Sequence, residues 1–245
     1  MVPAANMHDN MQSLRTVYQG LTAQKRPDKR GQVFAFTAAR SGCGTSYVTR
    51  MLAIIAAREA AKTEGAQVLL VDMDIQNNAQ SRYFFAQQNF DQFGQMDGPY
   101  DATYGEIPFW RITPSMVDEE GRNLTDNHFM SLYRLSQIPL SFSYFQWDQF
   151  REGQAAHLQN ARAYWHKLRE HYTAIFVDTP AQDRSDMLSV ICEDTDATIL
   201  VSAPEHSRSQ DLSNIANKVA SLGAKCTGVI LNQVVSQPSY YEKNT

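Results

Sequence analysis

The residues best suited to chemistry lie at 39–46, where an apolar stretch runs into a glycine-containing turn and then a helical pattern. Gly42 and Gly44 let the backbone approach an anion closely, and the amides that open a helix carry the positive end of its dipole. Against the template G-x-x-x-x-G-K-[ST], Gly44 matches the second glycine and Ser46 the magnesium-binding hydroxyl. The segment predicts a phosphate-binding loop that contacts a nucleotide through Arg40, Ser41, Gly42, Cys43, Gly44, Thr45 and Ser46.

The loop departs from the template at two positions. Ala39 replaces the first glycine, and Thr45 replaces the lysine that normally neutralises the terminal phosphates. A charge-assisted hydrogen bond of this kind contributes about 1.5–3 kcal/mol. We therefore expect ATP or ADP to bind weakly, and phosphoryl transfer to suffer more, because it depends on stabilising developing charge. Arg40 is the nearby cation that could replace the lysine.

Two further apolar stretches, residues 68–72 and 174–178, end in aspartate. Continuous apolar runs are typical of buried parallel strands, whose carboxyl ends meet at one edge of a sheet. Carboxylates at such an edge suit a hard cation, bound directly or through water. We expect Ser46, Asp72 and Asp178 to organise Mg²⁺ beside the loop.

The order of these motifs resembles that of MinD/ParA-type P-loop ATPases, and most closely that of the bacterial tyrosine kinases (BY-kinases) of capsule and exopolysaccharide export. Asp72-Met-Asp74 is similar to their second Walker-A-like motif, and Asp178-Thr-Pro180 is similar to their Walker B motif. The resemblance implies a P-loop NTPase fold that binds ATP or ADP with Mg²⁺. It further implies catalytic roles for Asp74 and Asp72, with Asp74 as the base that accepts a proton from tyrosine.

The resemblance also assigns roles near the chain's carboxyl end. Asn232 corresponds to the strand-end asparagine that reads adenine in MinD-like relatives, although asparagine is also a common turn residue. Tyr240 and Tyr241 correspond to the tyrosine cluster that neighbouring BY-kinase subunits phosphorylate. A frayed terminus with incidental tyrosines explains this pair equally well.

The N-terminal segment has two interpretations. Residues 13–16, Ser-Leu-Arg-Thr, resemble part of the E-x-x-R-x-x-R element through which BY-kinases assemble into rings, with Asp9, Gln12 and Arg15 at its three charged positions. Apolar residues between 10 and 21 also fall at helical spacing, which fits a helix packed on the domain. We weigh ring assembly, and hence a homo-oligomer, equally with simple packing.

Strand and helix patterns alternate along the chain, which predicts an α/β fold with a mainly parallel sheet flanked by helices on both faces. We divide the chain into a helix and basic linker at 1–31, a P-loop NTPase-like domain at 32–235 and a tail at 236–245. A central strand is predicted at 110–112 and an amphipathic helix from Ala155. Residues 81–150 hold 16 of the 26 aromatic residues, which predicts core packing for most of them and leaves a partner-binding surface open.

Composition excludes several other classes. The net charge of −4 and the lack of a basic stripe argue against nucleic acid as a partner. No apolar run is long enough to cross a bilayer, and the three cysteines are not spaced as metal ligands, so we expect a cytoplasmic protein with reduced thiols. Recruitment to the inner face of the membrane would require a partner.

Three functions follow from these patterns. The first is a degenerate BY-kinase-like protein that supports exopolysaccharide or capsule biosynthesis and export through the cytoplasmic segment of a membrane co-polymerase or export protein. Thr45 favours it, and so does Gln76, which stands where these kinases carry an arginine. The second is an active ATP-dependent tyrosine autokinase, and the third is a MinD/ParA-type positioning ATPase.

Overall fold

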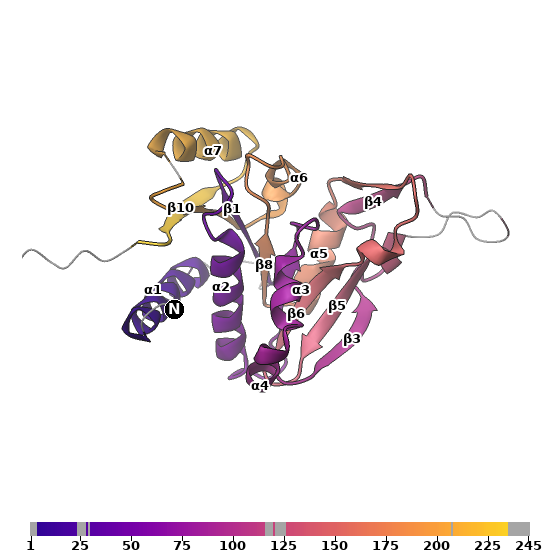
Figure 1. Ribbon diagram of the computed structural model, residues 1–245, viewed down its shortest axis with the longest axis horizontal. Helices are drawn as coiled ribbons and strands as arrows, with labels where there is room; N and C mark the ends of the chain where they lie inside the picture. Colours follow the sequence, from indigo (N-terminus) through magenta and orange to yellow (C-terminus); the bar gives the residue numbers. More distant parts are fainter. Residues whose placement is uncertain are drawn as a thin grey trace, which may run out of the picture.

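The computed structural model describes residues 4–23, 28, 30–115, 120, 126–206 and 208–234, with side chains from residue 11 onward. Within these residues the chain forms one eight-stranded and one two-stranded sheet. Helices cover both faces of the larger sheet (Figure 1). The predicted α/β architecture with a mainly parallel sheet is confirmed.

The large sheet combines a parallel part with an antiparallel extension. Its strands, taken from one edge to the other, are β10 (Cys226–Leu231), β9 (Ala197–Ser202), β1 (Gln32–Ala38), β8 (Ala174–Asp178), β2 (Val68–Asp72), β6 (Leu140–Phe145), β5 (Met130–Leu135) and β3 (Met96–Asp101). Neighbours from β10 to β6 pair in parallel. The β6–β5 and β5–β3 pairs are antiparallel, so the aromatic-rich region builds the extension.

The three central strands bring the predicted site together. Every residue of β8 and of β2 is buried, as expected for strands covered on both faces. The register pairs Asp72 with Asp178 across β2 and β8, and it pairs Asp178 with Phe36 on β1. The two aspartates and the loop that follows β1 therefore lie together at the carboxyl ends of the central strands.

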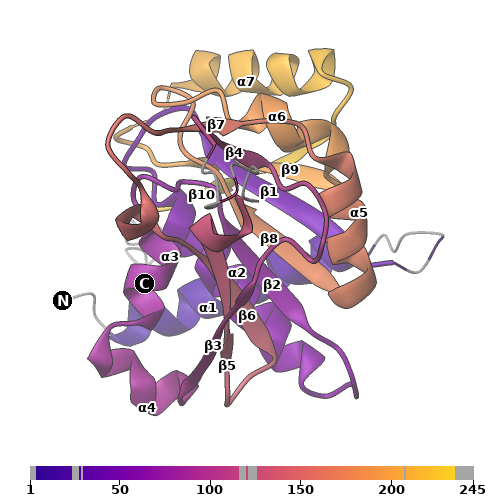
Figure 2. The same cartoon turned by 90° about the vertical axis from the view of Figure 1, so that its right-hand side faces the viewer.

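The helices divide between two hydrophobic clusters, one on each face of the sheet (Figures 1 and 2). The helices are α1 (Ala4–Thr22), α2 (Thr45–Ala60), α3 (Ala79–Phe84), α4 (Phe90–Phe93), α5 (Arg162–His171), α6 (Leu188–Ile191) and α7 (Ser209–Ser221). Residues of α1, α2, α3 and α4 belong to one cluster, and residues of α5, α6 and α7 to the other. The sheet thus separates two cores.

The N-terminal helix is confirmed as α1, and it packs along α2. Leu14 is buried in the α2 cluster, and the half-buried apolar residues that join it are Met11, Val17, Tyr18 and Leu21. Gln12 and Arg15 are exposed on the same helix. The packing interpretation therefore describes this helix, and ring assembly stays a prediction.

Two sequence predictions were wrong in detail. The strand predicted at 110–112 is β4 (Trp110–Thr113), which lies outside the central sheet and pairs with β7 (Ala155–Leu158) in the two-stranded sheet. Consequently the helix predicted from Ala155 begins only at Arg162, as α5. Side-chain exposure along β7 alternates, which is the two-residue period of a strand. The apolar residues Leu158 and Ala161, which precede α5, happen to fall at helical spacing with those of α5. The predicted helix therefore began too early.

Core packing accounts for much of the aromatic-rich region, as predicted. Phe84, Phe142 and Phe145 are almost fully buried, and the Phe84 and Phe142 rings stack with centroids 4.7 Å apart. Phe85 and Trp147 are partly exposed beside this core. A partner-binding surface in this region stays a prediction.

Candidate functional site

The loop between β1 and α2 has the backbone of a phosphate-binding turn. Gly42 and Gly44 adopt positive φ angles of 89° and 80°, which favour glycine over any residue with a side chain. A Cβ atom at Gly44 would lie 2.3 Å from the Asn232 side-chain nitrogen. The two glycines singled out in the sequence are therefore required by the fold.

The first turn of α2 offers its amides to an anion. Gly44 occupies the N-cap position and makes no side-chain capping hydrogen bond. The first amides of a helix lack intrahelical acceptors and carry the positive end of the helix dipole. The geometry at Thr45 and Ser46 therefore suits a phosphate group even without the lysine of the template.

Protein groups hold the outer part of the loop. The Ser41 amide and hydroxyl both donate to Asp183, at 3.0–3.1 Å. The Asn232 amide donates to the Cys43 carbonyl at 2.9 Å, which places the predicted adenine-reading residue against the loop backbone. The Gln233 side chain, which was not predicted from the sequence, donates to the carbonyl of Gly42, the residue before Cys43.

Arg40 pairs with an aspartate on α7. Its Nε atom donates to the Asp211 carboxylate on α7 at 3.0 Å, and half of its side chain is exposed. Arg40 is also not the only cation near the site, because Arg50 and Arg184 reach the aspartates from α2 and from the segment after β8.

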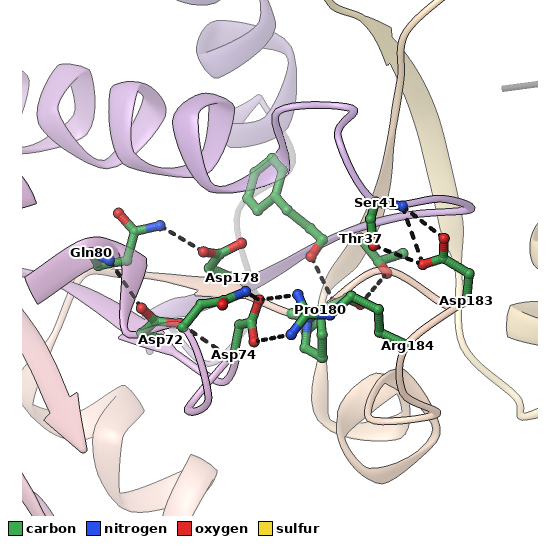
Figure 3. Close-up of polar contacts among 12 residues, drawn as sticks. Thr37, Ser41, Asp72, Asp74, Gln80, Asp178, Pro180, Asp183 and Arg184 are labelled. Carbon is green, nitrogen blue, oxygen red and sulfur yellow. Dashed lines mark hydrogen bonds and ion pairs between the residues drawn. The ribbon is translucent and has the colours of Figure 1, made fainter. Parts of the chain in front are cut away.

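The structure brings Asp72, Asp74 and Asp178 together, with Gln80 on one side and Arg184 on the other (Figure 3). Both oxygens of Asp72 accept backbone hydrogen bonds at 3.0 Å, one from Asp74 and one from Gln80. Asp178 is fully buried, and its Oδ1 atom has no hydrogen-bond partner in the described part of the chain.

Burial raises the pKa values of Asp72 and Asp178, the two aspartates that are paired across β2 and β8. Burial raises the pKa of Asp178 to about 6, against the lowering effect of its polar contacts with Ser46 and Gln80. Burial also raises the pKa of Asp72 well above its ordinary value, and repulsion from Asp178 raises it further. The fold therefore holds two carboxyl groups side by side where full ionisation of both is unfavourable.

Asp74, the predicted catalytic base, is engaged in an ion pair. Its two carboxylate oxygens accept from the two terminal nitrogens of Arg184, at 2.7 and 3.0 Å, and Asn77 donates to one of them at 2.8 Å. Bidentate pairing with an arginine fixes the orientation of a carboxylate. Its catalytic role stays a prediction.

Gln80 and Arg50 are the main site residues that the sequence analysis missed. The Gln80 side-chain amide donates to Asp178 Oδ2 at 2.7 Å and to the Ser46 carbonyl at 3.0 Å, and its oxygen accepts from Arg50 at 3.1 Å. The Arg50 guanidinium also lies 4.0 Å from the centre of the Tyr83 ring. The available signal was spacing, because Arg50 follows Ser46 by one helical turn.

The contacts of Asp72 and Asp178 compete with direct binding of a divalent cation by these carboxylates, and their role as metal residues with Ser46 stays a prediction. Backbone amides occupy both Asp72 oxygens, and a side-chain amide occupies one Asp178 oxygen. Among the described residues, no three His, Cys, Asp or Glu side chains meet in a way that would hold a metal ion.

The remaining predicted residues lie elsewhere. Gln12 and Arg15 are on the exposed side of α1, and Asp9 is in the same helix, but its side chain is outside the described set. Tyr240 and Tyr241 fall outside the described residues. The part of the chain that the structure describes has no helix long and apolar enough to span a membrane.

Comparisons with known proteins place the fold. Neither a protein-family model nor a curated protein matches the sequence. Solved structures do match: the kinase domain of Escherichia coli tyrosine kinase ETK superposes with a TM-score of 0.60 at 13% identity, covering 94% of this chain and 79% of that one. The chain has the fold of a bacterial tyrosine kinase domain.

Two other matches support this conclusion. The VpsO kinase domain superposes with a TM-score of 0.55 at 15% identity, over 95% of this chain and 100% of that one. The MinC:MinD cell division complex of Aquifex aeolicus matches with a TM-score of 0.52 at 18% identity, over 83% of this chain and 69% of that chain. The resemblance to BY-kinases and MinD-type ATPases is thus confirmed at the level of the fold.

Proposed function

We propose that this protein is a degenerate BY-kinase-like protein that supports exopolysaccharide or capsule biosynthesis and export. In this proposal it binds the cytoplasmic segment of a membrane co-polymerase or export protein, and it binds nucleotide weakly or does not use it as a phosphate donor. The BY-kinase fold supports the lineage.

One observation carries the proposal: the residues that should organise a nucleotide and its metal satisfy one another instead. Thr45 brings no positive charge to the loop. Asp74 is paired with Arg184, and Asp178 accepts a hydrogen bond from Gln80. Phosphoryl transfer relies on cations aimed at the transferred group, so this arrangement favours a binding role over catalysis.

The binding part is tested by calorimetric titration of the purified protein with ATP and ADP, with and without Mg²⁺. We expect weak binding in the wild type. Thr45→Lys should tighten it by about tenfold to a hundredfold, because the restored charge contributes about 1.5–3 kcal/mol. Thr63→Lys, which adds the same charge at an exposed position beyond α2, is the matched control and should change nothing.

The catalytic part is tested with ATP and Mg²⁺ by phosphotyrosine detection on the wild type and on Tyr240→Phe/Tyr241→Phe. We expect no robust signal. A strong signal that the double variant loses would contradict the proposal and would favour the active autokinase. In the source cell, Asp74→Asn should restore polysaccharide to a deletion strain, whereas the autokinase requires this variant to fail.

A further inference from the structure

Gln80 lies beside the two aspartates at which a divalent cation is predicted to bind. It belongs to α3, is fully buried, and contacts three other elements at once. Its backbone amide donates to Asp72 at the end of β2, while its side chain reaches Asp178 on β8 and Ser46 on α2. The side-chain amide therefore lies between Asp178 and the first turn of α2.

The surrounding contacts fix the orientation of this amide. Arg50 offers only donors, so the Gln80 atom that faces it must be the carbonyl oxygen. The NH₂ group must then face Asp178 and the Ser46 carbonyl, both of which are acceptors. The reversed orientation would oppose donor to donor and acceptor to acceptor. The nitrogen lone pair of an amide is delocalised into its carbonyl group, so the NH₂ group cannot ligate a metal ion and competes with one for Asp178 Oδ2.

Arg50 supplies the positive charge. The Arg50 side chain is half-buried, and its guanidinium is attracted by both Asp178 and Asp72. The guanidinium also packs over the face of the Tyr83 ring. A guanidinium keeps its charge in proteins. A divalent cation that approached Asp178 would meet this fixed charge and would have to displace the Gln80 amide. Mg²⁺ in nucleotide sites is bound through one or two carboxylates together with phosphates and water. Here the Gln80 amide holds one of the two Asp178 oxygens.

We infer that Gln80 and Arg50 stand in for the divalent cation of the nucleotide site, so that any phosphate-bearing ligand of the loop binds independently of Mg²⁺. The inference deepens the proposed function and rests on it in taking the loop as a phosphate site. Gln80 is the residue that excludes the metal, and Arg50 is the positive charge that holds the Gln80 carbonyl and is attracted by the two carboxylates.

The first test titrates the protein with Mn²⁺ in the absence of nucleotide, following the signal of free Mn²⁺ by electron paramagnetic resonance. Gln80→Glu keeps the shape of the side chain and replaces the donor with a carboxylate beside Asp178. Gln137→Glu adds the same charge at an exposed position between β5 and β6. We expect no Asp178-dependent Mn²⁺ binding in the wild type or in Gln137→Glu, and a gain of about tenfold or more in Gln80→Glu.

Two outcomes would overturn the inference. One is Mn²⁺ binding by the wild type that Asp178→Asn abolishes, and the other is Gln80→Glu with no more affinity than the wild type. If Gln80→Glu does not fold, Gln80→Ala replaces it, because removing the amide also frees Asp178 Oδ2. The same gain in Mn²⁺ affinity relative to wild type is then required.

The second test measures ADP affinity in Mg²⁺ and in EDTA. Equal affinities in the wild type are expected, and a Mg²⁺-dependent affinity would overturn the inference. If ADP does not bind at all, the Mn²⁺ titration alone decides. The proposed function fails by a different result, robust tyrosine phosphorylation, so the two failures can be told apart.

Discussion

The two halves of the candidate site meet at one edge of the sheet but are built from different materials. The loop half consists of backbone: two glycines with positive φ angles and the amides that open α2. The aspartate half consists of side chains: Asp72 and Asp178 with Gln80 and Arg50 around them. The first half keeps the shape of a phosphate-binding turn with Thr45 at the template's lysine position, and the second half is closed by contacts among its own side chains.

The difference indicates how such a site changes. A cradle made of main-chain amides depends on the path of the chain, which the whole fold maintains. A cation site made of side chains depends on a few residue identities, and we propose that the Gln80 amide fills it here. The comparison can be tested by perturbing each half separately.

The largest effect is expected in the loop, from Gly44→Ala. A non-glycine residue in this backbone region costs about 1–3 kcal/mol, and here the new Cβ atom would also lie 2.3 Å from Asn232. Gly105→Ala is a matched control, because its φ of 81° is similar and no atom lies within 4 Å of the added Cβ. Urea unfolding should show a greater loss for Gly44→Ala, and equal losses would mean that the loop tolerates the contact.

The next effect has the opposite sign and concerns the aspartate half. Asp178→Asn should stabilise the protein at neutral pH by at most about 3 kcal/mol, because burial raises the pKa of Asp178 from 3.8 to about 6 and each pKa unit corresponds to about 1.4 kcal/mol. Asparagine can still accept the hydrogen bond from Gln80.

The pH dependence follows from the sign of this shift. The folded-state pKa lies above the unfolded value, so wild-type stability is lost as the pH rises through the folded pKa near 6. The advantage of Asp178→Asn should therefore be greatest above pH 6 and should vanish below the ordinary value of 3.8. Chemical denaturation across this range measures it, and a difference that does not depend on pH would contradict the assignment.

The smallest effect is expected at Asp74. Arg184→Met should cost about 1–2 kcal/mol, less than the loss of a fully buried partner, because a third of the Arg184 side chain is exposed. Adding Asp74→Asn should recover part of the loss by removing the unpaired carboxylate. Thermal melting of both variants checks this prediction, and additive losses would show that the pair is not coupled.

The sequence predicted the features that rest on local patterns. Glycine spacing identified the loop, and apolar runs ending at Asp72 and Asp178 identified the two strands whose register joins those residues. The contacts that close the aspartate half could not be predicted in this way. Arg50, Gln80 and Asp178 lie on three elements, and only the packed sheet brings them within hydrogen-bond distance.

The errors have similar causes. The strand at Trp110 was assigned to the central sheet because a buried apolar segment does not reveal its partner, which is β7. The contact between Arg40 and Asp211, 171 residues later, was also not foreseen, and the role of Arg40 as the lysine substitute stays a prediction. Partner choice across long separations is set by tertiary packing.

The register between β2 and β8 has a consequence for engineering. Because Asp72 and Asp178 are direct partners across adjacent strands, the main chain fixes their separation, while the side chains at positions 45, 50 and 80 decide what can lie between them and the loop. A designer who wished to install a metal-dependent nucleotide site would keep the scaffold and substitute those three positions. The distance between the two halves is already built into the sheet.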